Sequence, residues 1–135
     1  MVDSNPQLPN PNKLPTSNSQ KREKPYDIRK RTFEFALRML AVASVLPKEG
    51  YGPTIADQLS RSGTFVGANV EEADGAVSKA DKRRTLVVAR KELREARYWL
   101  SIIDRIWGQH LSVREDVGEA TELLNILSTI ITNLS

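Results

Sequence analysis

Hydrophobic positions recur at alternating steps of three and four from about residue 27 onward, which is the spacing of one face of an α-helix. Four segments carry this pattern one after another, and the residues on their apolar faces are, in order: Ile28, Thr32, Phe35, Met39, Val42 and Leu46; Ile55, Leu59, Ser62, Val66, Asn69 and Ala73; Leu86, Ala89, Leu93, Ala96, Leu100, Ile103 and Trp107; and Val113, Val117, Ala120, Leu124, Leu127, Ile131 and Leu134. In the first segment a second apolar row widens the stripe that we expect to be buried: Phe33, Ala36, Leu40 and Ala43. No segment alternates with a period of two between turn signals, so we expect no β-sheet.

Capping and breaking residues set the ends of these segments. Helix-stopping residues follow the first three: Pro47, Gly75 and Gly108. N-cap signatures precede the last two: Ser78 with Asp81, and Ser112 with Glu115. The helices are therefore about 20, 22, 30 and 23 residues long, and connections of about seven, two and four residues make sequential helices antiparallel neighbours. The predicted fold is an all-α, antiparallel up-down-up-down four-helix bundle.

The first 25 residues differ in composition from the rest. Five of the seven prolines lie there, among Asn, Ser and Gln. Too few apolar side chains accompany them to offset the entropy of ordering the backbone. We expect residues 1–25 to be a disordered N-terminal tail and residues 26–135 to form one bundle domain.

Composition narrows the range of possible chemistry. The 135 residues include no cysteine and one histidine, His110, which excludes disulfides, thiolate metal sites and multi-histidine metal sites. No apolar run is long enough for a membrane span, and the N-terminus lacks a signal-peptide core, so we expect a cytoplasmic protein with no membrane partner. Di-iron bundles need inward Glu-x-x-His pairs, and His110 is better explained as a loop residue beside a cap. We predict no enzyme activity and no cofactor.

Basic residues gather on one side of the third helix, within about 80° of arc at 100° per residue. The residues of this stripe that we single out are Lys79, Arg83, Arg90, Arg94 and Arg97. One interpretation is a nucleic-acid contact, supported by a further basic cluster near the N-terminus: Lys21, Arg22, Lys24, Arg29, Lys30 and Arg31. The other is a solvated or intersubunit face, whose turn-proximal members are neutralised by the acids that end the second helix: Glu71, Glu72 and Asp74.

The third helix also has more apolar surface than one bundle needs, about 160° where little more than 100° suffices. Trp99 and Ile102 lie at the margin of this arc, so we expect them at an interface between subunits.

Polar residues lie close to the apolar face of the second and third helices. Half-buried charges need partners, because losing solvation costs several kcal/mol per ion. We therefore predict a structural network between these helices, with Arg61 bonded to Glu72 or Glu92. Its members are Gln58, Arg61, Asn69, Glu72 and Glu92.

Two blocks of sequence resemble a small bacterial family known as four-helix bundle proteins, some of which are encoded in intervening sequences of 23S rRNA genes. The first block runs from Leu46-Pro47-Lys48 through Gln58-Leu59-x-Arg61-Ser62-Gly63-Thr64 to Gly67-Ala68-Asn69-Val70-Glu71-Glu72-Ala73. The second comprises Ser78-Lys79-Ala80-Asp81 and Lys91-Glu92-x-x-Glu95-x-Arg97-Tyr98-Trp99-Leu100. Phe65 and Lys82 depart from the family pattern, which usually has Ser and an aromatic residue there.

The resemblance implies an antiparallel four-helix bundle that assembles into a ring, typically a pentamer. Distant relatives of the family, the accessory variability proteins of retroelements, form similar basic rings that bind RNA. Together with the basic stripe, this leads us to predict a non-enzymatic homo-oligomer that binds structured RNA. The alternative is a protein–protein interaction scaffold with no nucleic-acid role.

Overall fold

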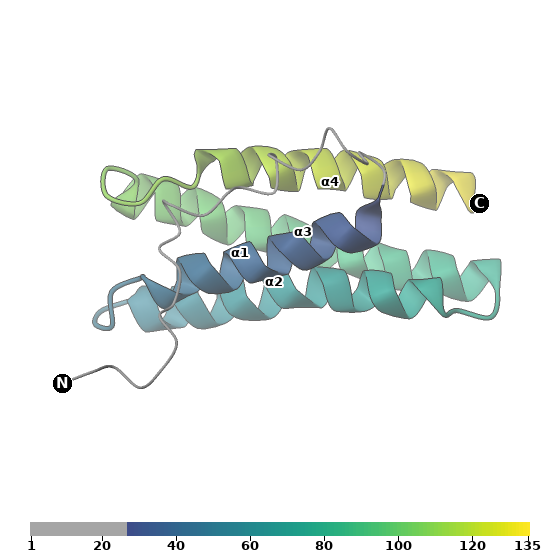
Figure 1. Ribbon diagram of the computed structural model, residues 1–135, viewed down its shortest axis with the longest axis horizontal. Coiled ribbons are helices and arrows are strands. Elements are labelled where there is room, and N and C mark those ends of the chain that lie inside the picture. Colours follow the sequence, from purple (N-terminus) through teal and green to yellow (C-terminus); the bar gives the residue numbers. More distant parts are fainter. Residues whose placement is uncertain (1–26) are drawn as a thin grey trace.

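The computed structural model describes residues 27–135, which form four α-helices joined by short connections (Figure 1). These are α1 (Ile28–Ser44), α2 (Gly52–Asp74), α3 (Lys79–Trp107) and α4 (Arg114–Asn133). Within this part of the chain there is no β-strand. The predicted tail over residues 1–25 lies outside the described residues.

The helices form an antiparallel up-down-up-down bundle, as the sequence predicts (Figure 1). The most extensive contacts are those of α2 with its sequence neighbours α3 and α1, followed by that of α3 with α4. The contact between α1 and α4, which closes the bundle, is much the smallest. Three sides of the bundle are thus closely packed and the fourth is not.

Side-chain caps are formed at the N-termini of two of the four helices, α1 and α3. The Asp27 carboxylate accepts a hydrogen bond from the Lys30 backbone N–H at 3.2 Å, which caps α1. The Ser78 hydroxyl accepts from the Asp81 N–H at 3.1 Å and caps α3 as predicted. Val113 occupies the N-cap position of α4, so this helix begins later than the expected start at Ser112.

The other boundaries differ from the sequence pattern by a turn or less. Gly75 and Gly108 occupy the C-cap positions of α2 and α3, as predicted. The first helix ends at Ser44, before its last predicted apolar position at Leu46, and the second begins at Gly52, ahead of its first predicted apolar position at Ile55. Hydrophobic patterns locate a helix well but fix its last turn poorly, because helix ends fray.

The apolar faces read from the sequence do form the core. All seven predicted positions of α3 but Trp107 are buried: Leu86, Ala89, Leu93, Ala96, Leu100 and Ile103. In α2, Val70 takes the inward position and Asn69 is only half-buried. The second apolar row of α1 is only in part what the sequence suggests, because Phe33 is 61% exposed and Leu40 is 43% exposed.

Two glycines allow α1 and α2 to pack closely. A Cβ at Gly63 would lie 2.5 Å from the Cβ of Met39, and a Cβ at Gly67 would lie 3.2 Å from the Thr32 carbonyl oxygen. Any larger residue at Gly63 would therefore push the two helices apart.

Candidate nucleic-acid interface

The basic stripe of α3 adjoins α4, and we call it the arginine face: Lys79, Arg83, Arg90, Arg94 and Arg97. Arg90 Nη1 donates to Ser128 Oγ at 3.2 Å, and Arg97 Nη1 donates to Thr121 Oγ1 at 3.2 Å. These bonds hold the two guanidinium groups beside α4. The other three side chains of the face are exposed.

Carboxylates do not neutralise the arginine face. Within residues 27–135, no ion pair joins any of its five side chains to an acid. Thr121 and Ser128 belong to a row of α4 residues spaced three or four apart, which share one face of that helix. Every residue of this row is uncharged: Gly118, Thr121, Asn125, Ser128 and Thr132. Arg90 Nε is in addition buried without a hydrogen-bond partner. The face is therefore a row of cations beside neutral hydroxyl groups.

The acids at the end of α2 pair elsewhere than the sequence suggested. Glu71 accepts two hydrogen bonds from Arg29, at 2.9 and 3.0 Å, and Asp74 lies 3.3 Å from the same guanidinium. The hydrogen bond to Glu71 raises the pKa of Arg29, and the bond from Arg29 lowers the pKa of Glu71. The expected neutralisation across the α2–α3 turn is thus wrong for Glu71 and Asp74. At that turn the ion pair is between Arg84 and Asp81.

Two members of the N-terminal basic cluster are neutralised by acids of the bundle. Arg29 and Arg31 pair with acids of the bundle, and Lys21, Arg22 and Lys24 lie outside the described residues. Within the described chain, the candidate anion-binding charge is therefore that of α3.

The predicted polar network between α2 and α3 is reduced to an ion pair. Arg61 Nη1 lies 3.9 Å from Glu92 Oε1 and 3.9 Å from Glu95 Oε2, too far for hydrogen bonds. The Arg61 guanidinium carbon also lies 5.3 Å from the centroid of the Phe65 ring. Glu92 Oε1 is buried without a hydrogen-bond partner.

The remaining members of that network are not brought together. Asn69 Nδ2 donates to the Phe65 carbonyl of its own helix at 2.8 Å. Glu72 is exposed and Gln58 is half-buried, and neither is bonded to Arg61 or Glu92. The polar strip therefore does not tie α2 to α3 as a network.

Two buried ion pairs, which the sequence analysis missed, join α1 to α4 instead. Arg31 donates to the Glu119 carboxylate at 2.6 and 3.1 Å, and Arg38 donates to the Asp116 carboxylate at 2.9 and 3.0 Å. At most 4% of any of these four side chains is exposed. Long charged side chains thus fill the side of the bundle where the helices have fewest close contacts.

Burial and ion pairing shift the pKa values of these buried groups in opposite directions. Burial raises the pKa of the Asp116 carboxyl, and the hydrogen bonds and charge of Arg38 only partly reverse that rise. Burial lowers the pKa of the Arg31 guanidinium, but Glu119 and Glu122 together raise it above its ordinary value. The sequence does contain one indication of the α1–α4 ion pairs. Arg31 and Arg38 are seven residues apart, so both fall on one edge of the apolar face of α1.

Two groups of exposed apolar side chains lie on the surfaces of the helices. The first is a row on the outward side of α1, and we call it the α1 row: Phe33, Leu37 and Leu40. The second follows the contact of α2 with α3, and we call it the α2–α3 strip: Phe65, Val88 and Ile106. Trp99 and Ile102, predicted at a subunit interface, are half-buried on the same side of α3 and pack against the core.

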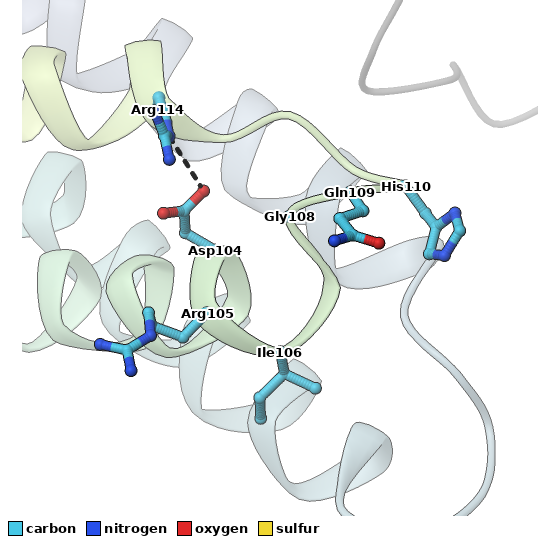
Figure 2. Close-up of a pocket in the computed structure, with 7 residues that line it drawn as sticks. All are labelled: Asp104, Arg105, Ile106, Gly108, Gln109, His110 and Arg114. Carbon is cyan, nitrogen blue, oxygen red and sulfur yellow. Dashed lines mark ion pairs between the residues drawn. The ribbon is translucent and has the colours of Figure 1, made fainter.

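A pocket of about 500 Å³ lies at the connection of α3 to α4 (Figure 2). Arg105 and His110 belong to its lining, and Arg114 Nε lies 3.6 Å from the Asp104 carboxylate within it. That acid opposes anion binding in the pocket.

Among residues 27–135, no three acidic or histidine side chains cluster as a metal site would require. None of the described helices is long and apolar enough to cross a membrane.

Comparison with known proteins agrees with this bundle. Residues 24–133 match the family described as 23S rRNA-intervening sequence protein. A crystal structure of a protein of unknown function, from the S23 ribosomal protein family of Bacteroides thetaiotaomicron, is 30% identical. It superposes with a TM-score of 0.67, covering 87% of this chain and 99% of that one. No curated protein matches the chain. With four antiparallel helices and a match over nearly its whole length, this chain belongs to the 23S rRNA-intervening sequence protein family.

Proposed function

We propose that this protein is a non-enzymatic, ring-forming homo-oligomer that binds structured RNA in the cytoplasm through the arginine face. The observation that carries the proposal is the absence of any carboxylate partner for its five basic side chains within residues 27–135. Guanidinium groups bind phosphate with paired, charge-assisted hydrogen bonds, and unneutralised rows of them are the footprint of a nucleic-acid surface.

The geometry fits phosphate contacts better than base reading. Arg90 and Arg97 lie two turns apart, about 10 Å along the helix axis, with Arg94 between them. Their bonds to Ser128 and Thr121 occupy one nitrogen each and leave other guanidinium N–H groups able to donate. Five phosphate contacts would give the logarithm of affinity a slope of about −3.5 to −4.5 against the logarithm of salt concentration.

Fluorescence anisotropy with a labelled hairpin RNA tests this proposal. We expect binding at low salt, the steep salt dependence given above, and loss of binding when Arg90→Glu is combined with Arg94→Glu. The matched control combines Lys48→Glu with Arg114→Glu, which changes the net charge equally at exposed positions outside both the arginine face and the N-terminal basic cluster. Equal binding by the two double variants would contradict the proposal.

The exposed apolar surfaces support the oligomer. The α1 row and the α2–α3 strip are different surfaces, so a contact between them would be head-to-tail, and repeated contacts of that type form a ring when the rotation between subunits closes. Light scattering should give a mass well above the 15.1 kDa of one chain. Phe33→Asp with Leu37→Asp should lower that mass, whereas Val77→Asp, an exposed apolar position in the α2–α3 turn, should not. A monomeric natural protein would refute the ring.

The competing function is a protein-interaction scaffold in which the same arginines face acids of neighbouring subunits. The observation in its favour is that Arg90 and Arg97 are half-buried rather than fully solvated. In that case Arg90→Glu with Arg94→Glu would lower the mass of the oligomer. Under the RNA proposal the mass is unchanged while RNA binding is lost.

A further inference from the structure

Tyr98 is a large aromatic side chain that the bundle does not use for packing. It lies on the outward side of α3 and is 60% exposed. Its ring meets the half-buried Trp99 ring nearly at right angles, with centroids 5.2 Å apart and an interplanar angle of 74°. Trp99 packs against the core, so it supports the Tyr98 ring without covering it in a parallel stack.

Arginines precede and follow Tyr98 along α3. On the same helix Arg94 lies one turn before Tyr98, Arg97 is its neighbour in sequence, and Arg105 lies two turns after it. Along the helix axis Arg94 is about 6 Å and Arg105 about 10 Å from Tyr98. Arg94 and Arg97 belong to the arginine face, and Arg105 extends it toward the pocket of Figure 2.

The one acid within a turn of Tyr98 on α3 is Glu95, and its contacts are with groups outside the arginine face. Glu95 Oε2 accepts a hydrogen bond of 3.4 Å from Trp99 Nε1 and lies 3.9 Å from Arg61 of α2. Its charge is therefore directed toward α2 and away from the arginine face. Tyr98 is left as an aromatic surface at the edge of an unneutralised cationic row.

We propose that Tyr98 stacks an unpaired RNA base while Arg94, Arg97 and Arg105 contact the phosphates on either side of it. This inference rests on the proposed function and names its ligand class: structured RNA with at least one unpaired nucleotide, in a loop or bulge. Bases inside a duplex are stacked on one another and cannot meet a ring on a convex helix surface. An exposed aromatic residue flanked by arginines is the arrangement that binds splayed bases.

The test uses the full chain and three RNA probes: a hairpin with one 2-aminopurine in its loop, a hairpin with the same analogue in its stem, and a fully paired duplex. Tyr98→Ala should weaken binding of the loop-labelled hairpin about 5- to 100-fold and leave duplex binding unchanged. Tyr98→Phe keeps the aromatic surface and should bind within about twofold of the natural protein. The natural protein should change the fluorescence of the loop analogue, and Tyr98→Ala should not.

The results separate this inference from the proposed function. If Tyr98→Ala binds the hairpin and changes the loop fluorescence as the natural protein does, the stacking role is overturned while RNA binding by the arginine face stands. If Tyr98→Ala lowers the mass of the oligomer, Tyr98 belongs to a subunit interface and the inference is also overturned. Normal binding by Arg90→Glu with Arg94→Glu would overturn the proposed function itself.

Discussion

The buried Arg38–Asp116 pair allows a sharp test of what closes the bundle. In the natural protein Arg38 donates two hydrogen bonds to the Asp116 carboxylate, at 2.9 and 3.0 Å, and a third to the Ser112 carbonyl at 3.2 Å. The two side chains are 4% and 2% exposed. Arg38→Met would replace the guanidinium with an apolar group of similar length and leave the carboxylate buried without its partner.

The expected cost at neutral pH is about 3–5 kcal/mol, the usual loss when one partner of a buried ion pair is removed. Two hydrogen bonds to charged groups, at about 1.5–3 kcal/mol each, sum to about 3–6 kcal/mol, which agrees with that range. For a chain of this length the loss corresponds to a decrease in Tm of about 10–20 °C. Replacing both partners, with Arg38→Met and Asp116→Leu, should recover most of that stability, because no charge then remains buried.

Acid should rescue the single variant. Burial already raises the pKa of Asp116 above its ordinary value of 3.8, and removing Arg38 removes the groups that hold it down. A carboxyl whose folded-state pKa is raised imposes no penalty below its unfolded pKa and an increasing one as the pH rises through the folded value. The stability difference between Arg38→Met and the natural protein should therefore be smaller near pH 4 than at pH 7.

Urea unfolding followed by circular dichroism measures these differences at one fixed protein concentration, because oligomerisation shifts apparent stability. The double variant serves as the control, since it lacks the titrating carboxyl and should lose its stability difference from the single variant as the pH falls. A loss that is independent of pH, or a double variant as unstable as the single one, would refute this account of the α1–α4 contact.

Three further outcomes can be checked by simpler measurements. Gly63→Ala places a Cβ 2.5 Å from the Cβ of Met39 and should destabilise the bundle by about 1–3 kcal/mol in urea unfolding, although alanine favours helices; an unchanged midpoint would contradict the close packing of α1 on α2. Ser78→Ala removes the N-cap of α3 and should cost about 1 kcal/mol, which Ser78→Asp should restore; equal losses would argue against the cap. Arg29→Ala should return the pKa of Glu71 toward its ordinary value of 4.5 in a carboxyl NMR titration. In the natural protein the stabilisation from this ion pair is lost as the pH falls through the lowered pKa of Glu71, and the variant should lack that pH-dependent stabilisation.

The sequence predicted the helices well because their apolar spacing is regular. The buried positions of α3 are spaced three or four residues apart. Gly75 and Ser78 mark the turn before α3, because these residue types are favoured at the C-cap and N-cap of helices. What it could not supply is which helix edges meet. The outward position of Phe33 and the inward position of Arg31 depend on how α1 is rotated against α2 and α4, and spacing alone does not fix that rotation.

The same limit explains the misplaced polar network. Arg61 and Glu92 do approach each other, but Arg61 remains half exposed and the pair stays at 3.9 Å. Arg38 and Asp116 are buried and bonded, yet they are 78 residues apart and each stands beside an apolar face on its own helix. A charged residue at such an edge is read as solvated unless its distant partner is known, so the pairing had to come from the structure.

The way the bundle closes has a consequence for the order in which it folds. The α2–α3 hairpin joins two long helices through a short turn and makes the largest interhelical contact, so it can dock early at small cost in loop entropy. The α1–α4 ion pairs join residues 88 and 78 positions apart and contribute little until the rest of the chain is in place. Substitutions at Arg31 or Arg38 should therefore accelerate unfolding far more than they slow folding. We expect low φ-values for residues of the α1–α4 contact and values nearer one in the α2–α3 hairpin.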